Sequence, residues 1–258
     1  MTDRRIPIVA SVITHFMMRS IRRHFAAVRL SGLWPDPKPG QGVIVYANHP
    51  SWWDPAVFAL LQNRMFPGRR GYGPIDAEAV RAYPLLEYAG FMPLDRTSSS
   101  SRRHFLTTAT KYLNEGHVVW ITVEGTFADP RKRPLHPQPG IAHLMKGAPQ
   151  ALVIPLALDY AFWTESRPEI LLRLGAPAIS PAESITEERL ILCRDALTAT
   201  LDVLLAAASE RNPYTFETLL TGRAGIGGVY DFLRRILAWK RGIAFNPRHD
   251  RSRRERRA

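Results

Sequence analysis

Hydrophobic positions recur along this chain in two patterns, one typical of buried strands and one typical of amphipathic helices. Short apolar runs rich in β-branched residues predict strands at 43–47, 117–123 and 152–158, with weaker runs at 71–75, 90–96 and 169–174. Helical patterns follow most of these runs, at about 55–62, 76–82, 98–114, 141–146 and 184–205. Strands that alternate with helices predict an α/β fold, a layered sandwich with a mostly parallel central sheet flanked by helices.

Two basic amphipathic segments flank this region. Between Ile6 and Val28, apolar residues recur every four positions, at Ile13, Met17, Ile21 and Phe25. A comparable apolar stripe runs through 229–241. Either stripe can lie in a membrane interface or pack on the domain, and the pattern leaves both open. We therefore expect a basic membrane-surface helix over 1–34, the α/β domain over 35–221, and a basic helix with a disordered arginine-rich tail over 222–258.

The net positive charge is concentrated at the two ends of the chain. The net charge is +12, of which residues 1–30 carry +5 and residues 222–258 carry +8, so the middle is close to neutral. Basic ends favour an anionic partner, and the interleaved apolar residues favour an anionic membrane surface over nucleic acid. We therefore expect no nucleic-acid partner.

The longest uncharged apolar stretch, 6–18, is shorter than the roughly 20 residues that a spanning helix needs. The protein is therefore expected to lie on a membrane as a peripheral protein. Its single cysteine, Cys193, excludes an internal disulfide and every metal site built from several cysteines. This indicates a reducing compartment and hence the cytoplasmic face of the membrane.

The segment 42–55, GVIVYANHPSWWDP, carries the strongest candidate for chemistry. His49 follows a predicted strand, and Asp54 precedes Pro55 at the start of a predicted helix. Asp54 is expected to cap that helix, and the short loop brings it near His49. A carboxylate on one imidazole nitrogen makes the other nitrogen a usable general base. An H-x4-D spacing is common by chance, and the strand-to-helix context is what makes this pair a candidate.

Two other strand ends carry polar residues. Asp95 and Arg96 end one predicted strand, and Glu124, Gly125 and Thr126 follow another. Because the carboxyl ends of parallel strands share one edge of a sheet, we expect these residues to converge with His49. Arg96 can instead form a surface ion pair with Asp95, and Glu124 can be a structural carboxylate.

Four segments together resemble the motifs of the lysophospholipid acyltransferase family, which includes the 1-acylglycerol-3-phosphate O-acyltransferases. They are NHPSWWD at 48–54, GFMPLDR at 90–96, VEGT at 123–126 and VIPL at 153–156. They stand in the order of the family's motifs, which makes the resemblance specific. It implies an O-acyltransferase of phospholipid biosynthesis that uses acyl-CoA or acyl-acyl carrier protein, a lysophospholipid or related lipid acceptor, and no metal or bound cofactor.

The same resemblance implies a role for each matched residue. His49 would take the proton of the acceptor hydroxyl, and Asp54 would orient His49. Arg96 would bind the acceptor phosphate, and Glu124, Gly125 and Thr126 would shape the acceptor site. Phe127 departs from the Arg or Ser that many members carry after Thr.

This departure leaves the acceptor open. Either the basic loop supplies the charge through Arg131, Lys132 or Arg133, or the headgroup is not the usual phosphate, as in a glycolipid. A non-catalytic membrane-binding protein of the same fold is a further alternative. A serine hydrolase is disfavoured, because the chain contains no G-x-S-x-G.

Overall fold

The computed structural model describes residues 3–181, 183–223, 225 and 228–245. Its strands are β1 (Ala27–Ser31), β2 (Val43–Ala47), β3 (Gly71–Asp76), β4 (Phe91–Leu94), β5 (Val118–Thr122), β6 (Leu152–Ala161), β7 (Glu169–Leu174), β8 (Ala178–Ile179) and β9 (Glu217–Thr221). Its helices are α1 (Pro7–His24), α2 (Asp54–Met65), α3 (Ala77–Ala82), α4 (Ser99–Asn114), α5 (Gly140–Gly147), α6 (Thr186–Ser209) and α7 (Gly228–Lys240), with 3-10 turns η1 (Pro84–Ala89) and η2 (Pro213–Thr215).

The strands form one sheet in the order β4-β3-β5-β2-β6-β7-β1-β9, with β8 paired to β6. Adjacent strands within the run β4-β3-β5-β2-β6 are parallel to one another, and β1 is parallel to β7. The β6–β7, β1–β9 and β6–β8 pairs are antiparallel. This confirms the predicted α/β fold with a mostly parallel sheet, and it gives β2, β4 and β5 a common carboxyl edge.

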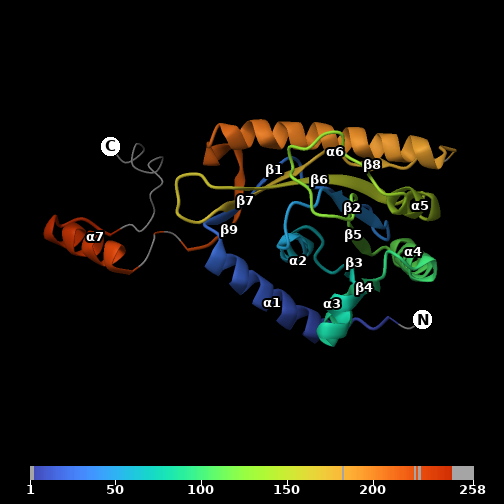
Figure 1. Cartoon of the computed structure of the whole chain (residues 1–258), viewed down its shortest axis with the longest axis horizontal. Helices are drawn as coiled ribbons and strands as arrows, with labels where there is room; N and C mark the ends of the chain where they lie inside the picture. Colours follow the sequence, from blue (N-terminus) through green and yellow to red (C-terminus); the bar gives the residue numbers. More distant parts are fainter. Residues whose placement is uncertain (1–2, 182, 224, 226–227, 246–258) are drawn as a thin grey trace.

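Helices cover both faces of the sheet (Figure 1). Alternate residues of β2 point to opposite sides, so that Val43 and Val45 belong to the core beneath α1 and α2. Ile44 and Tyr46 belong to the core beneath α4, α5 and α6. A strand buried on both faces reads as a continuous apolar run, which is why residues 43–47 are so readily predicted.

The N-terminal helix ends earlier than its sequence pattern suggests. A helix continuing to Val28 is wrong, because α1 ends at His24 and Phe25 has extended backbone angles. Residues 27–31 form β1, which pairs with β7 and β9. The boundary expected at residue 34 therefore falls after the first strand of the sheet.

The four-residue stripe of α1 packs on the domain. Ile21 and Phe25 are fully buried, and Met17 packs against the same core. A different stripe of α1, formed by Ile8 and the residues four and eight positions later, is exposed. The side of the helix that remains available to a membrane is therefore not the side that the sequence pattern singled out.

The long helix predicted from residue 184 starts two residues later than expected. Helix α6 begins at Thr186, and the Glu188 carboxylate accepts the backbone N–H of Ile185 at 3.0 Å. The Ser184 hydroxyl instead donates to the Pro181 carbonyl. The apolar face of α6 is buried at its centre, where Cys193 is 2% exposed in the core.

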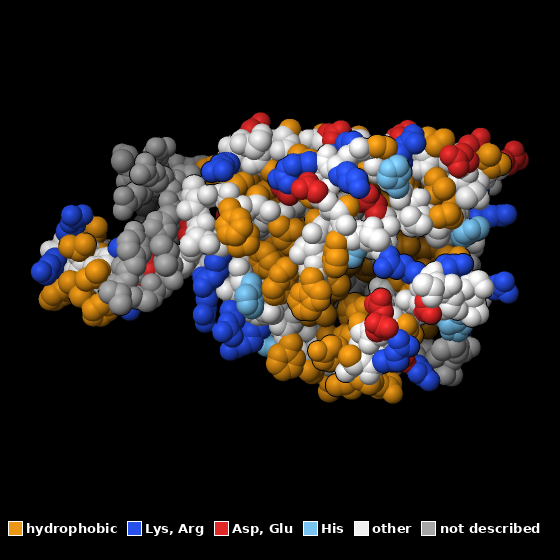
Figure 2. Space-filling view, viewed as in Figure 1, with side chains coloured by type: hydrophobic (Ala, Val, Ile, Leu, Met, Phe, Trp, Pro, Cys, Tyr) orange, Lys and Arg blue, Asp and Glu red, His pale blue; other side chains and the backbone are white. Residues whose placement is uncertain are grey.

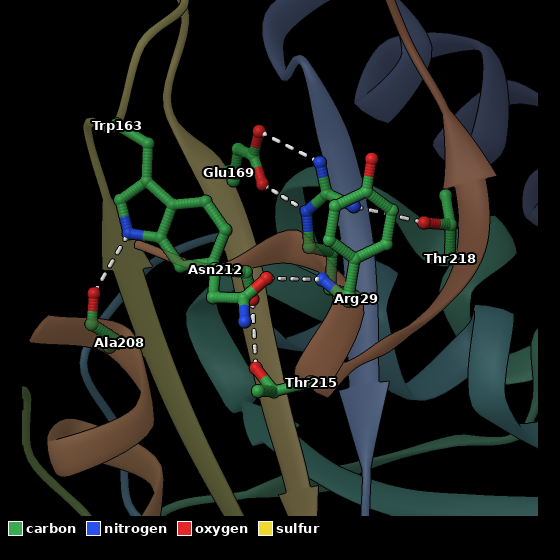
Figure 3. A network of polar contacts seen from close by, with 8 residues as sticks. Arg29, Trp163, Glu169, Ala208, Asn212, Thr215 and Thr218 are labelled. Carbon is green, nitrogen blue, oxygen red and sulfur yellow. Dashed lines mark hydrogen bonds and ion pairs between the residues drawn. The ribbon is translucent and has the colours of Figure 1, made fainter. Parts of the chain in front are cut away.

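A buried ion pair joins β1 and β7, the two strands that follow β6 in the sheet order. Arg29 on β1 donates through Nε and Nη2 to the Glu169 carboxylate on β7, and through Nη1 to the Thr218 hydroxyl on β9 at 3.0 Å (Figure 3). The Arg29 guanidinium lies 5.6 Å from the ring centroid of Trp163. The Trp163 indole in turn donates to the Ala208 carbonyl near the end of α6. This network links three strands to the helix that covers them.

The amphipathic segment near the C-terminus is helical in α7, which stands out from the α/β body in Figure 1. Phe232, Leu233, Leu237 and Trp239 on this helix are exposed. The arginine-rich tail, which was expected to be disordered, falls within residues 246–258 and lies outside the described residues. In the described part of the chain, no helix has both the length and the apolar character needed to cross a bilayer.

Candidate active site

The loop between β2 and α2 brings His49 and Asp54 into direct contact. His49 Nδ1 lies 2.6 Å from Asp54 Oδ2, and the Asp54 side chain is completely buried whereas that of His49 is 19% exposed. Because a carboxylate can only accept, Nδ1 carries the proton and Nε2 is left as an acceptor. This His49–Asp54 dyad has the geometry of a general base oriented by a carboxylate.

Asp54 does not cap α2 with its side chain, contrary to expectation. It is the first residue of the helix, Trp53 holds the capping position, and the helix start has no side-chain cap. The Asp54 carboxylate instead points toward the loop that precedes α2. Its Oδ2 also accepts the backbone N–H of Ser51 at 3.3 Å, and its Oδ1 accepts the Tyr160 hydroxyl at 2.6 Å. Together with His49, Ser51 and Tyr160 bond to both carboxylate oxygens of Asp54 and hold the carboxylate in one orientation.

Tyr160 is a site residue that was not predicted from the sequence. Burial raises the pKa of its hydroxyl well above the ordinary value, and the neighbouring Asp54 adds to the effect. The hydroxyl therefore stays protonated and donates to Asp54 across the physiological range. The one available signal was its position just after the strongly apolar run 152–158, because that run ends in β6 beside β2.

Asn48 ties the same loop to β6. Its side-chain nitrogen donates to the Leu158 carbonyl and its side-chain oxygen accepts the Leu158 N–H, both at 2.9 Å. Asn48 is 1% exposed, so these bonds are shielded from water. They fix the residue that immediately precedes His49, and they explain why an amide is needed at that position.

Arg96 approaches the turn at Gly125. Gly125 has φ +67°, and Arg96 Nη1 lies 3.0 Å from the point that a Cβ at Gly125 would occupy. A side chain there would strain the backbone and crowd the guanidinium. Within the described residues no ion pair joins Arg96 to Asp95, whose carboxylate accepts the N–H and hydroxyl of Thr97 instead. The structure thus brings two of the predicted site segments together.

The loop after β5 also lies against the dyad. The N–H of Ala128 donates to the His49 carbonyl at 3.0 Å, and the Phe127 ring centroid lies 4.3 Å from that of His49. Phe127 is 61% exposed, so an aromatic surface stands next to the imidazole. Glu124, half-buried, and Thr126, exposed, belong to the same turn as Gly125. The roles expected of Arg96, Glu124 and Thr126 remain predictions.

Comparisons with known proteins agree with the geometry. A family model described as Acyltransferase matches residues 27–159, just over half of the chain. The protein therefore belongs to the acyltransferase family and is an acyltransferase enzyme, which confirms the resemblance drawn from the four motifs.

Among solved structures, the chain is similar to the 1-acyl-sn-glycerophosphate (LPA) acyltransferase PlsC from Thermotoga maritima. The TM-score is 0.57 at 17% sequence identity, over 76% of this chain and 80% of that chain. This likeness shows a shared fold. The pilus retraction motor PilT with bound ADP also matches over 69% of this chain and 60% of that chain, at 12% identity, but its TM-score is only 0.37. A search of curated proteins found no matching sequence.

Proposed function

We propose that this enzyme transfers a fatty acyl group from acyl-CoA or acyl-acyl carrier protein to a hydroxyl of a lysophospholipid-type acceptor. The observation that carries the proposal is the 2.6 Å contact between His49 Nδ1 and the buried Asp54 carboxylate. A base held in one tautomer at a strand end suits attack by a hydroxyl on a thioester, and the similar fold of an LPA acyltransferase supports a lysolipid as acceptor.

In the proposed reaction, His49 Nε2 accepts the proton of the acceptor hydroxyl as the oxygen attacks the thioester carbonyl. The tetrahedral intermediate collapses by breaking the C–S bond, and the imidazolium returns the proton to the departing thiolate. Asp54 stabilises the imidazolium between these two steps. Arg96 is proposed to bind a phosphate oxygen of the acceptor, which positions the hydroxyl, and the turn 124–126 is proposed to shape the same site.

Acylation of defined lysolipids tests this function directly. We expect the purified full chain, given acyl-CoA or acyl-acyl carrier protein and a lysophospholipid in mixed micelles, to release free thiol and form the diacyl product in equal amounts. Mass spectrometry of the lipid and a thiol assay measure the two products. Thioester consumption without a diacyl product would indicate a hydrolase and contradict the proposal.

The proposed place of reaction is the cytoplasmic face of a membrane, to which α1 would bind peripherally. Ile8, Val12 and Phe16 are spaced four residues apart along α1 and are 72%, 49% and 64% exposed. Figure 2 shows hydrophobic side chains gathered over this part of the molecule, with arginines at the C-terminal end of α1. An exposed apolar stripe next to cationic residues suits an anionic bilayer interface.

Vesicle flotation tests the membrane proposal. We expect the wild type to float with vesicles that contain anionic lipid, and Ile8→Gln/Val12→Gln/Phe16→Gln to partition at least about tenfold more weakly, since each buried apolar side chain contributes about 1.5–3 kcal/mol when fully buried. A matched control, Ile191→Gln/Leu192→Gln/Val203→Gln, removes exposed apolar residues from α6 and should float as the wild type does. Equal flotation of the α1 variant would rule out this helix as the membrane contact.

A further inference from the structure

A cavity of about 290 Å³ adjoins the His49–Asp54 dyad. Ser51 and Trp53 from the loop before α2 line one side, and Asp159 and Tyr160 from the end of β6 line another. Tyr160 also donates to Asp54, so the cavity and the dyad share a wall. The volume is near the lower end of the range of about 300–1,000 Å³ for small-molecule sites, which suits a small polar group.

The cavity wall contains a buried carboxylate, that of Asp159, which accepts the backbone N–H of Tyr160 but makes no hydrogen bond to a cation among the described residues. Asp159 is only 3% exposed, and burial raises the pKa of its carboxyl above the ordinary value. The nearest cation, Arg131 Nη2, is 4.0 Å from Asp159 Oδ1, which is longer than a hydrogen bond. Arg131 is largely exposed and also binds Asp129. A carboxylate so placed opposes folding at neutral pH unless a further cation joins it.

Aromatic residues line the same cavity as this carboxylate. The rings of Phe25 and Trp53 are 5.1 Å apart and nearly perpendicular, and those of Phe25 and Tyr160 are 5.8 Å apart. These three residues and the exposed Phe162 line the cavity together with Asp159. A cavity lined by a carboxylate and several aromatic side chains is a favourable environment for an ammonium group, through ion pairing and cation–π attraction.

Arg131 gives the same cavity a cationic group, which can bind a phosphate oxygen. The cavity therefore presents one negative and one positive side chain about 4.0 Å apart. A phosphate monoester would meet Asp159 as a like charge, whereas a phosphodiester that ends in an ammonium group complements both side chains.

We propose that this cavity binds the zwitterionic headgroup of the acceptor lipid, with its ammonium group on Asp159 and with its phosphate held by Arg131 through a second oxygen beside the one assigned to Arg96. The inference rests on the proposed acyl transfer to a lysolipid. It makes Asp159 and Arg131 the residues that select the headgroup, a role that the sequence motifs did not assign to Asp159. The neutral ring of Phe127, at the position after Glu-Gly-Thr, is consistent with charge recognition taking place in this cavity.

Competition between two matched acceptors tests the headgroup assignment. Lysophosphatidylethanolamine and lysophosphatidylglycerol share the glycerophosphate and acyl parts, but only the first carries an ammonium group. We expect the wild type to favour lysophosphatidylethanolamine in kcat/KM by about 10- to 100-fold, the equivalent of one hydrogen bond between charged groups. Asp159→Asn should abolish this preference by lowering kcat/KM for lysophosphatidylethanolamine about 10- to 100-fold more than kcat/KM for lysophosphatidylglycerol. Arg131→Gln should weaken both acceptors, because both contain phosphate.

Asp202→Asn, which removes the exposed partner of Arg133, is the matched control and should retain the preference. Equal use of both acceptors by the wild type, or an equal loss of both in Asp159→Asn, would overturn the inference while leaving acyl transfer intact. A wild-type preference for lysophosphatidate over both of these acceptors would likewise overturn the inference while leaving acyl transfer intact. Failure to acylate any lysolipid would overturn the proposed function as well.

Thermal unfolding gives a readout that does not depend on catalysis. Because burial raises the pKa of Asp159, the ionised group opposes folding as pH rises through that pKa, and Asp159→Asn should melt at or above the wild-type temperature at pH 7. sn-Glycero-3-phosphoethanolamine, a phosphodiester that ends in an ammonium group, should at millimolar concentration raise the melting temperature of the wild type and not that of Asp159→Asn. A similar rise in both proteins would contradict the assignment of the ammonium group to Asp159.

Discussion

The His49→Ala variant is expected to lower kcat for acyl transfer by about 10²- to 10⁴-fold, the usual contribution of a general base. The substitution removes Nε2, the acceptor for the hydroxyl proton, and leaves the acceptor without a group to activate it. We expect KM to change much less than kcat, because a lysolipid is held mainly through its headgroup and acyl chain. Steady-state kinetics with a lysolipid acceptor, following the diacyl product, measure both parameters.

The matched control is His104→Ala, which removes an exposed imidazole from α4. It should retain kcat within about threefold. Circular dichroism and urea unfolding establish that both variants are folded, which matters because His49→Ala leaves the buried Asp54 carboxylate with Ser51 and Tyr160 as partners. A folded His49→Ala variant with nearly wild-type kcat would remove the general-base role.

The interior of the sheet could be predicted because its strands are buried on both faces. Residues 43–47, 118–122 and 169–174 form strands within one residue of the bounds expected from their apolar runs. The helices that cover them also follow local signals. Asp76 caps α3 by accepting the N–H of Glu78, and Ser98 caps α4 by accepting that of Ser101, at the first residues of the ranges predicted for these helices.

The edge of the sheet formed by β1 and β9 could not be predicted from local pattern. Residues 25–30 are apolar enough to continue a helix, and they form β1 because β7, about 140 residues later, offers a strand to pair with. Strand β9 depends in turn on β1. Such elements are decided by tertiary contacts, and a single sequence shows no signal for them.

The residues of the candidate site likewise include some that local sequence signals predict and some that depend on tertiary contacts. The contact between His49 and Asp54 spans five residues of one loop, so strand and helix signals on either side were enough to predict it. Tyr160 binds Asp54 across 106 residues of sequence, and Asp159 joins the cavity from the same strand. Their contributions depend on β6 lying beside β2, which a sequence pattern does not reveal.

The second large effect is expected on stability, when the buried ion pair between Arg29 and Glu169 is broken. The side chains of Arg29 and Glu169 are 8% and 4% exposed, and Glu169 pairs in register with Ala161, the residue after Tyr160. The Arg29→Met variant would leave Glu169 as an uncompensated buried charge. We expect it to lower the free energy of unfolding by about 3–5 kcal/mol, measured by urea denaturation.

Two further variants separate the buried charge from the loss of the arginine itself. Arg29→Met combined with Glu169→Leu removes both charges and should recover most of the lost stability, because an apolar pair of similar volume often replaces a buried ion pair at little cost. Thr218 is exposed, so water can replace its bond to Arg29. Arg194→Met breaks the exposed pair with Asp195 and should cost no more than about 1 kcal/mol. If the double variant were as unstable as Arg29→Met alone, the arginine would be stabilising the fold through its packing on Trp163 and not through Glu169.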